Sequence, residues 1–128
     1  MKIFVYGTLM TGFSNYNQIK PYVESIENAR AEGKLYDLGY FPAMVDGYAD
    51  VRGQLFKIDA AHEEEALKRL DRLEGHPSLY RREKREVFIE ETKELEEAWV
   101  YIYNNEISDD SRLIESGNWR KYSKLKGA

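Results

Sequence analysis

The chain has 128 residues, of which 42% are hydrophobic and 33% are charged, and this composition is typical of a folded globular protein rather than a disordered one. The formal net charge of −4 argues against a nucleic-acid partner, because phosphate recognition favours a basic surface. The sequence contains no cysteine, which excludes disulfides, thiolate nucleophiles and thiolate metal ligands.

We expect neither a signal peptide nor a membrane anchor. Lys2 leads directly into a short strand-like segment, and no apolar stretch approaches the length needed to span a membrane. Together with the lack of cysteine, this favours a cytoplasmic protein without a membrane partner. A chain of this length can bury a hydrophobic core as one unit, so we expect a single domain over residues 1–128.

The first half of the chain predicts strands and one short helix. Short apolar or alternating segments rich in β-branched residues are typical of strands. Such segments occur at Lys2–Val5, Ala29–Asp37 and Val51–Ile58. Gly33 lies inside the second of them, where a glycine indicates a bulge or a close backbone approach. A helix is expected over Asn15–Tyr22, with Ser14 as its N-cap and Pro21 limiting its regularity.

The second half predicts a longer helix followed by two strands. Asp59 can cap a helix over Ala60–Glu74, which stops before Gly75. The strands are expected at Tyr80–Glu90 and Leu95–Tyr103. After Asn104 the sequence is polar and ends in a basic tail. Strands therefore dominate, with two helices and no regular βαβ alternation, which predicts an α+β fold around a curled antiparallel or mixed sheet. Closure of this sheet into a barrel cannot be read from the pattern alone.

Glu74 breaks the amphipathic pattern of the longer helix. The apolar stripe of this helix contains Ala66, Leu67, Leu70 and Leu73. Glu74 lies four residues after Leu70 and seven after Leu67, so helical spacing places it within the stripe. Burial and the negative end of the helix dipole both disfavour a carboxylate there, and both raise its pKa toward the neutral range that catalytic glutamates use. The alternative is a side chain that is frayed into solvent at the helix end.

Asp71 lies at the edge of the same stripe, three residues before Glu74. A second carboxylate close to Glu74 would raise the pKa of one of the two groups. We favour a structural role for Asp71, either in a hydrogen bond or in an ion pair with Lys68 or Arg72.

Four segments of the sequence resemble one protein family. They are Phe4-Val5-Tyr6-Gly7-Thr8-Leu9, Leu70-Asp71-Arg72-Leu73-Glu74-Gly75, Tyr80-Arg81 and Gly117-Asn118-Trp119. The first is similar to the N-terminal signature of the γ-glutamylcyclotransferase-like (AIG2-like) proteins, and the second resembles the L-D-x-x-E-G motif of that family. The family more often has aspartate where Asn118 stands, a difference that concerns packing more than chemistry. The resemblance covers nearly the whole chain.

This resemblance implies a fold, a reaction and a set of site residues. The fold is a small mixed or antiparallel β-barrel with flanking helices. The reaction cleaves a small-molecule γ-glutamyl amide to 5-oxoproline (pyroglutamate) and a free amine or amino acid, with Glu74 as the catalytic acid–base residue. The loop that binds the γ-glutamyl group contains Tyr6, Gly7, Thr8 and Leu9. Tyr80 either lines the same pocket or packs in the core as a strand aromatic.

The residues agree with the chemistry of such a reaction. The α-amino group of the substrate attacks its own γ-carbonyl, so neither a cofactor nor a protein nucleophile is needed, and enclosure of the reactive rotamer favours ring closure. One carboxyl group can accept a proton from the attacking amine and return it to the leaving amine. Backbone N–H groups in the turn after a strand can stabilise the oxyanion, and Gly7 allows a close approach of the backbone.

Two other interpretations remain open at this point. The chain could be a non-catalytic small-molecule binding module that retains the same pocket, or a different lyase or amidotransferase-like enzyme that uses it. We expect no metal site, because His62 and His76 lie on opposite sides of the longer helix without a paired ligand pattern. The sequence does not reveal the leaving group of the substrate, the oligomeric state or the biological pathway.

Overall fold

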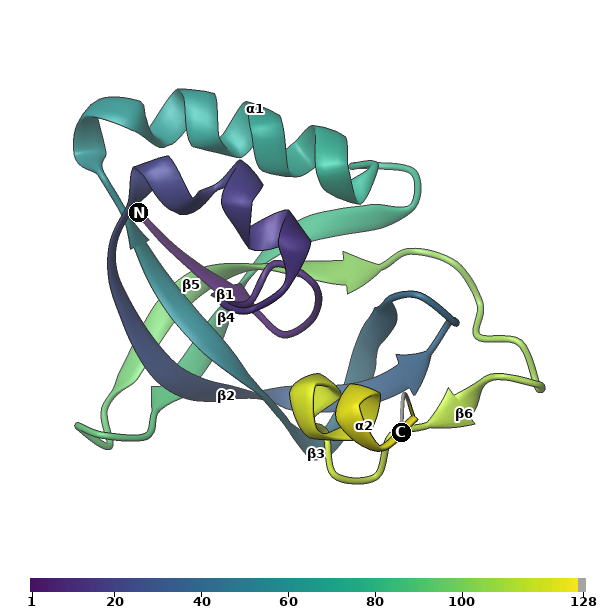
Figure 1. The fold of residues 1–128 in the computed structure, drawn as a ribbon. Helices are drawn as coiled ribbons and strands as arrows, with labels where there is room; N and C mark the ends of the chain where they lie inside the picture. The colour runs from purple at the N-terminus through teal and green to yellow at the C-terminus, as the bar shows by residue number, and fades with distance from the viewer. Residues whose placement is uncertain (127–128) are drawn as a thin grey trace.

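The computed structural model describes residues 1–126, and its main feature is a curved sheet that closes on itself (Figure 1). The strands are β1 (Lys2–Val5), β2 (Val23–Asp37), β3 (Pro42–Ile58), β4 (Tyr80–Ile89), β5 (Leu95–Tyr103) and β6 (Arg112–Leu113). Their order is β3-β1-β5-β4-β2-β6, and an additional pairing of β2 with β3 closes the first five into a barrel. β1 pairs with β5 in parallel, whereas all other pairings are antiparallel. The predicted α+β fold with a mixed β-barrel is therefore confirmed.

The helices lie outside the barrel. They are the 3₁₀ helices η1 (Ser14–Gln18), η2 (Lys20–Tyr22) and η3 (Ala60–His62) and the α-helices α1 (Glu63–Glu74) and α2 (Trp119–Lys126). Figure 1 shows α1 along the top of the barrel and α2 near its lower edge. Among residues 1–126, every helix is too short or too polar to cross a lipid bilayer.

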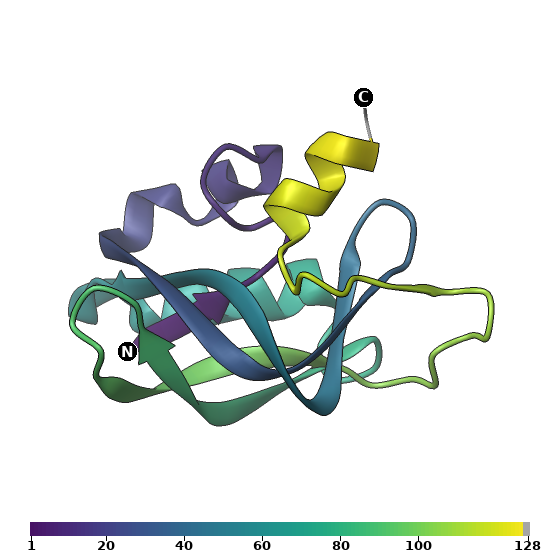
Figure 2. The ribbon, with the colours of Figure 1, turned by 90° about the horizontal axis from the view of Figure 1, so that it is seen from below.

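The long hairpin of β2 and β3 provides much of the barrel wall. The predicted strands Ala29–Asp37 and Val51–Ile58 are only parts of it, because β2 and β3 stay paired from Ser25 opposite Lys57 to Asp37 opposite Pro42. Cross-strand pairing thus extends both strands into polar segments of weak strand propensity. A register shift between Gly33 and Lys34 confirms the predicted bulge, and Figure 2 shows how strongly the hairpin bends.

The helix predicted over Asn15–Tyr22 is confirmed only in part, because this segment is helical but does not form one continuous helix. The chain forms η1 and η2 instead, and Ser14 is the first residue of η1 rather than an N-cap. Pro21 lies in η2, and its missing N–H prevents a continuous α-helix there.

The longer helix is close to the prediction, although its first turn is η3. The carboxylate of Asp59 accepts a hydrogen bond from the N–H of Ala61 at 3.2 Å, which confirms the expected cap. Gly75 ends α1 with a left-handed φ of 64°.

The polar C-terminal stretch contains an element that the sequence pattern does not predict. Residues 119–126 form α2, whose buried Trp119 stacks on Tyr122 with ring centroids 5.8 Å apart. A helix of eight residues with few apolar positions gives almost no periodic signal, and it is stabilised by packing against the barrel rather than by its own propensity. Buried Trp119 anchors α2 to the barrel.

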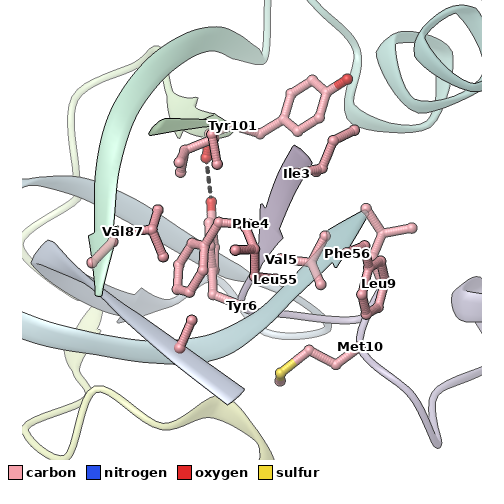
Figure 3. Packing of buried hydrophobic residues seen from close by; sticks show 14 of the residues in the cluster. Ile3, Phe4, Val5, Tyr6, Leu9, Met10, Leu55, Phe56, Val87 and Tyr101 are labelled. Carbon is pink, nitrogen blue, oxygen red and sulfur yellow. Dashed lines mark hydrogen bonds between the residues drawn. The ribbon is translucent and has the colours of Figure 1, made fainter. Parts of the chain in front are cut away.

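The barrel interior is packed with apolar side chains from every long strand. Figure 3 shows part of this core, including Ile3 and Phe4 from β1, Leu55 from β3 and Val87 from β4. All four side chains are fully buried. The core places the end of β1 near the middle of the barrel, where the chain turns out toward the site described below.

Gly53 lets β3 approach β1 closely. A Cβ atom at this position would lie 2.2 Å from the carbonyl oxygen of Val5, which is backbone and cannot move aside. We expect Gly53→Ala to lower the free energy of unfolding by about 1–3 kcal/mol, as measured by urea denaturation. Gly47→Ala on the same strand should cost less, because its Cβ would meet the Cγ of Lys34 at 2.4 Å, a side-chain contact that a change of the Lys34 rotamer can relieve. Equal stabilities of the two variants would contradict this account.

Candidate active site

A cavity of about 120 Å³ opens where β1 ends. Its walls come from the turn after β1, the start of β3, the last turn of α1, and β4 and β5. All of the site residues expected from the sequence line it: Tyr6, Gly7, Thr8, Leu9, Glu74 and Tyr80. The fold therefore brings together two segments that are more than sixty residues apart in the chain.

The turn after β1 is held tightly against the start of β3. The N–H of Met10 donates to the carbonyl of Gly7 at 3.1 Å, and a Cβ on Gly7 would lie 2.8 Å from the Pro42 ring. The Thr8 hydroxyl accepts a hydrogen bond from the Asn15 amide at 2.9 Å. Within residues 1–126, the backbone N–H groups of Gly7, Thr8 and Leu9 donate to no protein acceptor. All three residues line the cavity.

The side chain of Tyr6 has a packing role. Its hydroxyl donates to the carbonyl oxygen of Tyr101 at 2.6 Å, and Figure 3 shows this bond at the centre of the core. Burial, together with the nearby Tyr80 and Glu74, raises the pKa of Tyr6 well above its ordinary value. Leu9 is also buried. The segment therefore offers a ligand mainly its backbone, as the sequence indicates for Gly7.

Glu74 is the last residue of α1 and its side chain faces the cavity. The residue is partly buried, and among residues 1–126 its carboxylate has neither a hydrogen-bond nor an ion-pair partner. Burial raises the pKa of Glu74 from 4.5 to about 7, because the anion loses hydration and gains no hydrogen bond or ion pair from residues 1–126 in return. A carboxyl group in this state exchanges protons readily at neutral pH.

Asp71 is fully engaged in a structural network. Its carboxylate accepts two hydrogen bonds from Arg82, at 2.9 and 3.0 Å, and one from the Tyr101 hydroxyl at 2.7 Å. Burial alone would raise the pKa of Asp71, but these hydrogen bonds outweigh it and hold the pKa below its usual range. The structural role favoured from the sequence is confirmed, with Arg82 as the ion-pair partner in place of Lys68 or Arg72. The network ties the last turns of α1 to β4 and β5, and so fixes the helix end that carries Glu74.

Loss of the Asp71 carboxylate should therefore loosen this helix end. We expect Asp71→Asn to lower the free energy of unfolding by about 1–3 kcal/mol, because the guanidinium of Arg82 loses its charged partner. The matched control is Asp46→Asn, because Asp46 is exposed and pairs with Arg85 at the surface. Urea denaturation of both variants checks this, and a larger loss for Asp46→Asn would contradict it.

Tyr80 both lines the cavity and packs in the core, so the two roles considered for it coexist. Its hydroxyl donates to the carbonyl oxygen of Pro42 at 2.7 Å, and its ring packs edge-on against Phe41 and Tyr103. Burial and the nearby Glu74 raise the pKa of Tyr80, so the phenol stays neutral. A ligand would meet the ring rather than the hydroxyl.

The structure adds lining residues that the sequence did not indicate. They are Phe4, Val5, Asn15, Phe41, Pro42, Leu73, Leu79 and Tyr101. Leu73, the last apolar residue of the helical stripe, lies at the cavity and is 40% exposed. Within residues 1–126, no cluster of three or more potential metal ligands occurs.

Comparison with known proteins assigns the family. Residues 3–121 match the family described as "Gamma-glutamyl cyclotransferase, AIG2-like". The chain belongs to this family. A Vibrio cholerae protein named "Putative gamma-glutamylcyclotransferase" is 39% identical over 119 residues, which cover 91% of this chain and 93% of that protein.

Two further relatives extend the comparison of this AIG2-like chain. The Niallia circulans protein named "Gamma-L-glutamyl-butirosin B gamma-glutamyl cyclotransferase" is 30% identical over 125 residues, covering 94% of this chain and 76% of that protein. The crystal structure of an AIG2-like protein from Mus musculus superimposes with a TM-score of 0.72 at 24% identity, covering 84% of this chain and 80% of that one. The latter likeness shows that the two chains share the barrel fold.

Proposed function

We propose that this family member cleaves a γ-glutamyl amide by intramolecular attack of the α-amine, and releases 5-oxoproline and a free amine or amino acid. The observation that carries the proposal is the position of Glu74. Its unpartnered carboxyl, with a pKa of about 7, shares one small cavity with the free backbone N–H groups of the turn after β1. The chain would act as one domain and without a cofactor.

Proton transfer by Glu74 accounts for both chemical steps. The ionised carboxyl accepts a proton from the α-ammonium group, whose nitrogen then forms a bond to the γ-carbon. The neutral carboxyl next donates this proton to the amide nitrogen as the carbon–nitrogen bond breaks, so the amine leaves uncharged. The ring nitrogen gives its second proton to the regenerated carboxylate, which passes it to the released amine to form an ammonium ion. The carboxyl ends in its starting state, and no atom remains on the protein. A pKa near 7 suits a group that must both accept and donate a proton near neutral pH.

The turn after β1 supplies the second requirement of the reaction. Attack on the γ-carbonyl develops negative charge on its oxygen, which preorganised N–H donors stabilise. The N–H groups of Gly7, Thr8 and Leu9 border the cavity and are free of protein acceptors within residues 1–126. They are suited to bind both this oxygen and the α-carboxylate of the γ-glutamyl group. Binding in the cavity would also hold the flexible glutamyl chain near the rotamer that closes the ring.

The proposal is tested with a panel of γ-glutamyl amides and γ-glutamyl amino acids. Each compound is incubated with the purified protein, and 5-oxoproline is quantified by mass spectrometry. We expect product from at least one member, which also identifies the released amine. If a broad panel gives no 5-oxoproline while calorimetry detects binding of a panel member, the cyclotransferase proposal is wrong and the chain is a non-catalytic binding module.

A further inference from the structure

The turn between β2 and β3, residues 38–41, carries part of the cavity wall at the tip of the long hairpin. Phe41 and the adjoining Pro42 line the cavity. Figure 2 shows this tip standing out from the barrel, and Tyr40 in the turn is 92% exposed. Within the turn, the N–H of Leu38 donates to the carbonyl oxygen of Phe41 at 3.1 Å. A turn with so little packing of its own depends on a neighbouring element to hold Phe41 at the cavity.

The carboxylate of Asp37, the last residue of β2, is the point at which the turn is held. It accepts hydrogen bonds from the N–H of Gly39 at 2.7 Å, from the Tyr122 hydroxyl at 2.7 Å and from the Lys126 ammonium at 2.9 and 3.1 Å. The side chain of Asp37 is only 11% exposed. Burial alone would raise its pKa, but the bonds from Lys126, Tyr122 and Gly39 outweigh burial and hold the pKa below its usual range. Asp37 is therefore an anion whose donors come both from the turn and from α2.

Lys126 joins the end of β2 to the middle of the turn. Besides binding Asp37, its ammonium donates to the carbonyl oxygen of Gly39 at 2.6 Å. Charge-assisted hydrogen bonds of this kind are roughly twice as strong as neutral ones. The side chain of Lys126 is 42% exposed, so solvent screens each of its bonds in part. The attachment of the turn therefore depends on Asp37, Tyr122 and Lys126 acting together as one network.

The other end of α2 is anchored to the barrel. Trp119 is buried, and its ring stacks on that of Tyr122 with ring centroids 5.8 Å apart. The side-chain oxygen of Asn118 caps the helix by accepting a hydrogen bond from the N–H of Lys121 at 3.1 Å. The first turn of α2 is thus fixed, and its last turn reaches the hairpin tip, as Figure 2 shows. Among residues 1–126, the cavity lining includes no residue of α2, so Lys126 acts on a ligand through the turn between β2 and β3.

We propose that Asp37, Tyr122 and Lys126 are positioning residues, which together form a latch between α2 and the turn and keep Phe41 in the cavity wall around a bound γ-glutamyl compound. The inference rests on the proposed function for its ligand, and goes beyond it by giving α2 a part in substrate binding. When the latch is broken, the wall at Phe41 is free to move outward, and the substrate loses contacts that it makes equally in the ground state and in the transition state. Glu74 and the turn after β1 stay in place, so the loss falls on KM.

Hydrogen exchange tests the latch without any substrate. Lys126→Ala removes the ammonium, and amide exchange in the peptide that covers residues 37–42, followed by mass spectrometry, should become at least about tenfold faster than in the wild type. Lys126→Arg keeps a cationic donor and should restore most of the protection. Lys124→Ala is the matched control, because Lys124 is an exposed lysine on the same helix, whereas the lysine that Asp37 binds is Lys126. Unchanged exchange in Lys126→Ala, or an equal increase in Lys124→Ala, would overturn the latch.

Steady-state kinetics tests the positioning role with a substrate identified from the γ-glutamyl panel. In Lys126→Ala, KM should rise at least about fivefold while kcat stays within about twofold of the wild-type value. Tyr122→Phe removes one donor to Asp37 but keeps the ring, and should raise KM at least about twofold. Lys126→Arg should recover KM, and Lys124→Ala should leave both constants unchanged. A wild-type KM in both latch variants, or a fall in kcat alone, would overturn the positioning role and leave the cyclotransferase proposal standing.

Calorimetry decides on the latch if no panel member yields 5-oxoproline. The cyclotransferase proposal is then wrong, and the dissociation constant of a panel member takes the place of KM. Binding to Lys126→Ala that is at least about fivefold weaker than to the wild type supports the latch, because a held wall lowers the cost of ordering the site. Equal dissociation constants, or a wild type that binds no panel member, overturn it.

Discussion

Replacement of Glu74 by glutamine should reduce the formation of 5-oxoproline at least about 100-fold, because the amide can neither accept nor donate the proton that both steps require. Substrate binding should change little, since glutamine keeps the size of the side chain and its hydrogen-bonding capacity. The loss should therefore fall on kcat while KM stays nearly constant. Steady-state kinetics with a substrate identified from the γ-glutamyl panel measures this split, and circular dichroism establishes that the variant is folded.

Glu64→Gln is the matched control for this experiment. Glu64 lies on the same helix, but its side chain is exposed and forms an ion pair with Lys68. Its replacement should leave kcat within about twofold of the wild-type value, as expected for an exposed ion pair of small effect. A folded Glu74→Gln protein with wild-type turnover would exclude Glu74 from the mechanism. The reaction would then need another acid, and Asp71, the nearest carboxylate along α1, would be tested next despite its engagement with Arg82.

The sequence predicts the fold where periodicity and local signals agree. Alternating segments locate the barrel strands, Gly33 marks the bulge, and Asp59 and Gly75 mark the two ends of the longer helix. The prediction fails where tertiary contacts decide the conformation. The polar start of β2 is a strand only because β3 pairs with it, and α2 is a helix only because Trp119 packs against the barrel.

The candidate site shows the same division. Helical spacing alone places Glu74 on the apolar face of its helix, and the resemblance to the family supplies the turn that faces it. Neither the spacing nor the resemblance indicates Tyr101 or Leu79 as lining residues. Tyr101 reaches the cavity because the barrel curves, and Leu79 because of the path of the connection between α1 and β4. Neither feature leaves a local pattern in the sequence. The ion pair of Asp71 with Arg82 joins α1 to β4 across eleven residues of sequence. Asp71 binds Arg82 because α1 packs against β4, and helical spacing, which indicates Lys68 or Arg72, cannot predict this partner.

The stability of the protein should depend on pH through Glu74. In the folded state burial raises its pKa to about 7, whereas in the unfolded chain the group titrates near its ordinary value of 4.5. Between these two values the folded state holds a proton that the unfolded state has lost. Stability therefore falls as pH rises from 4.5 to 7, and the loss is complete above pH 7. Its upper limit is about 3.5 kcal/mol, from about 1.4 kcal/mol for each unit of pKa difference.

The difference between wild type and Glu74→Gln isolates this contribution. Glutamine has no proton to lose, so the variant should be more stable than the wild type at pH 8, by at most about 3.5 kcal/mol, and this advantage should shrink toward zero at about pH 3.5, where the wild-type carboxyl is largely neutral in both states. Urea denaturation at the two pH values measures both free energies of unfolding. Glu64→Gln should show no such pH-dependent difference, because Glu64 is exposed in the folded state. An advantage of Glu74→Gln that is the same at both pH values would mean that the carboxyl of Glu74 is ionised at its ordinary pKa, and a proton-transfer role near neutral pH would then lose its physical basis.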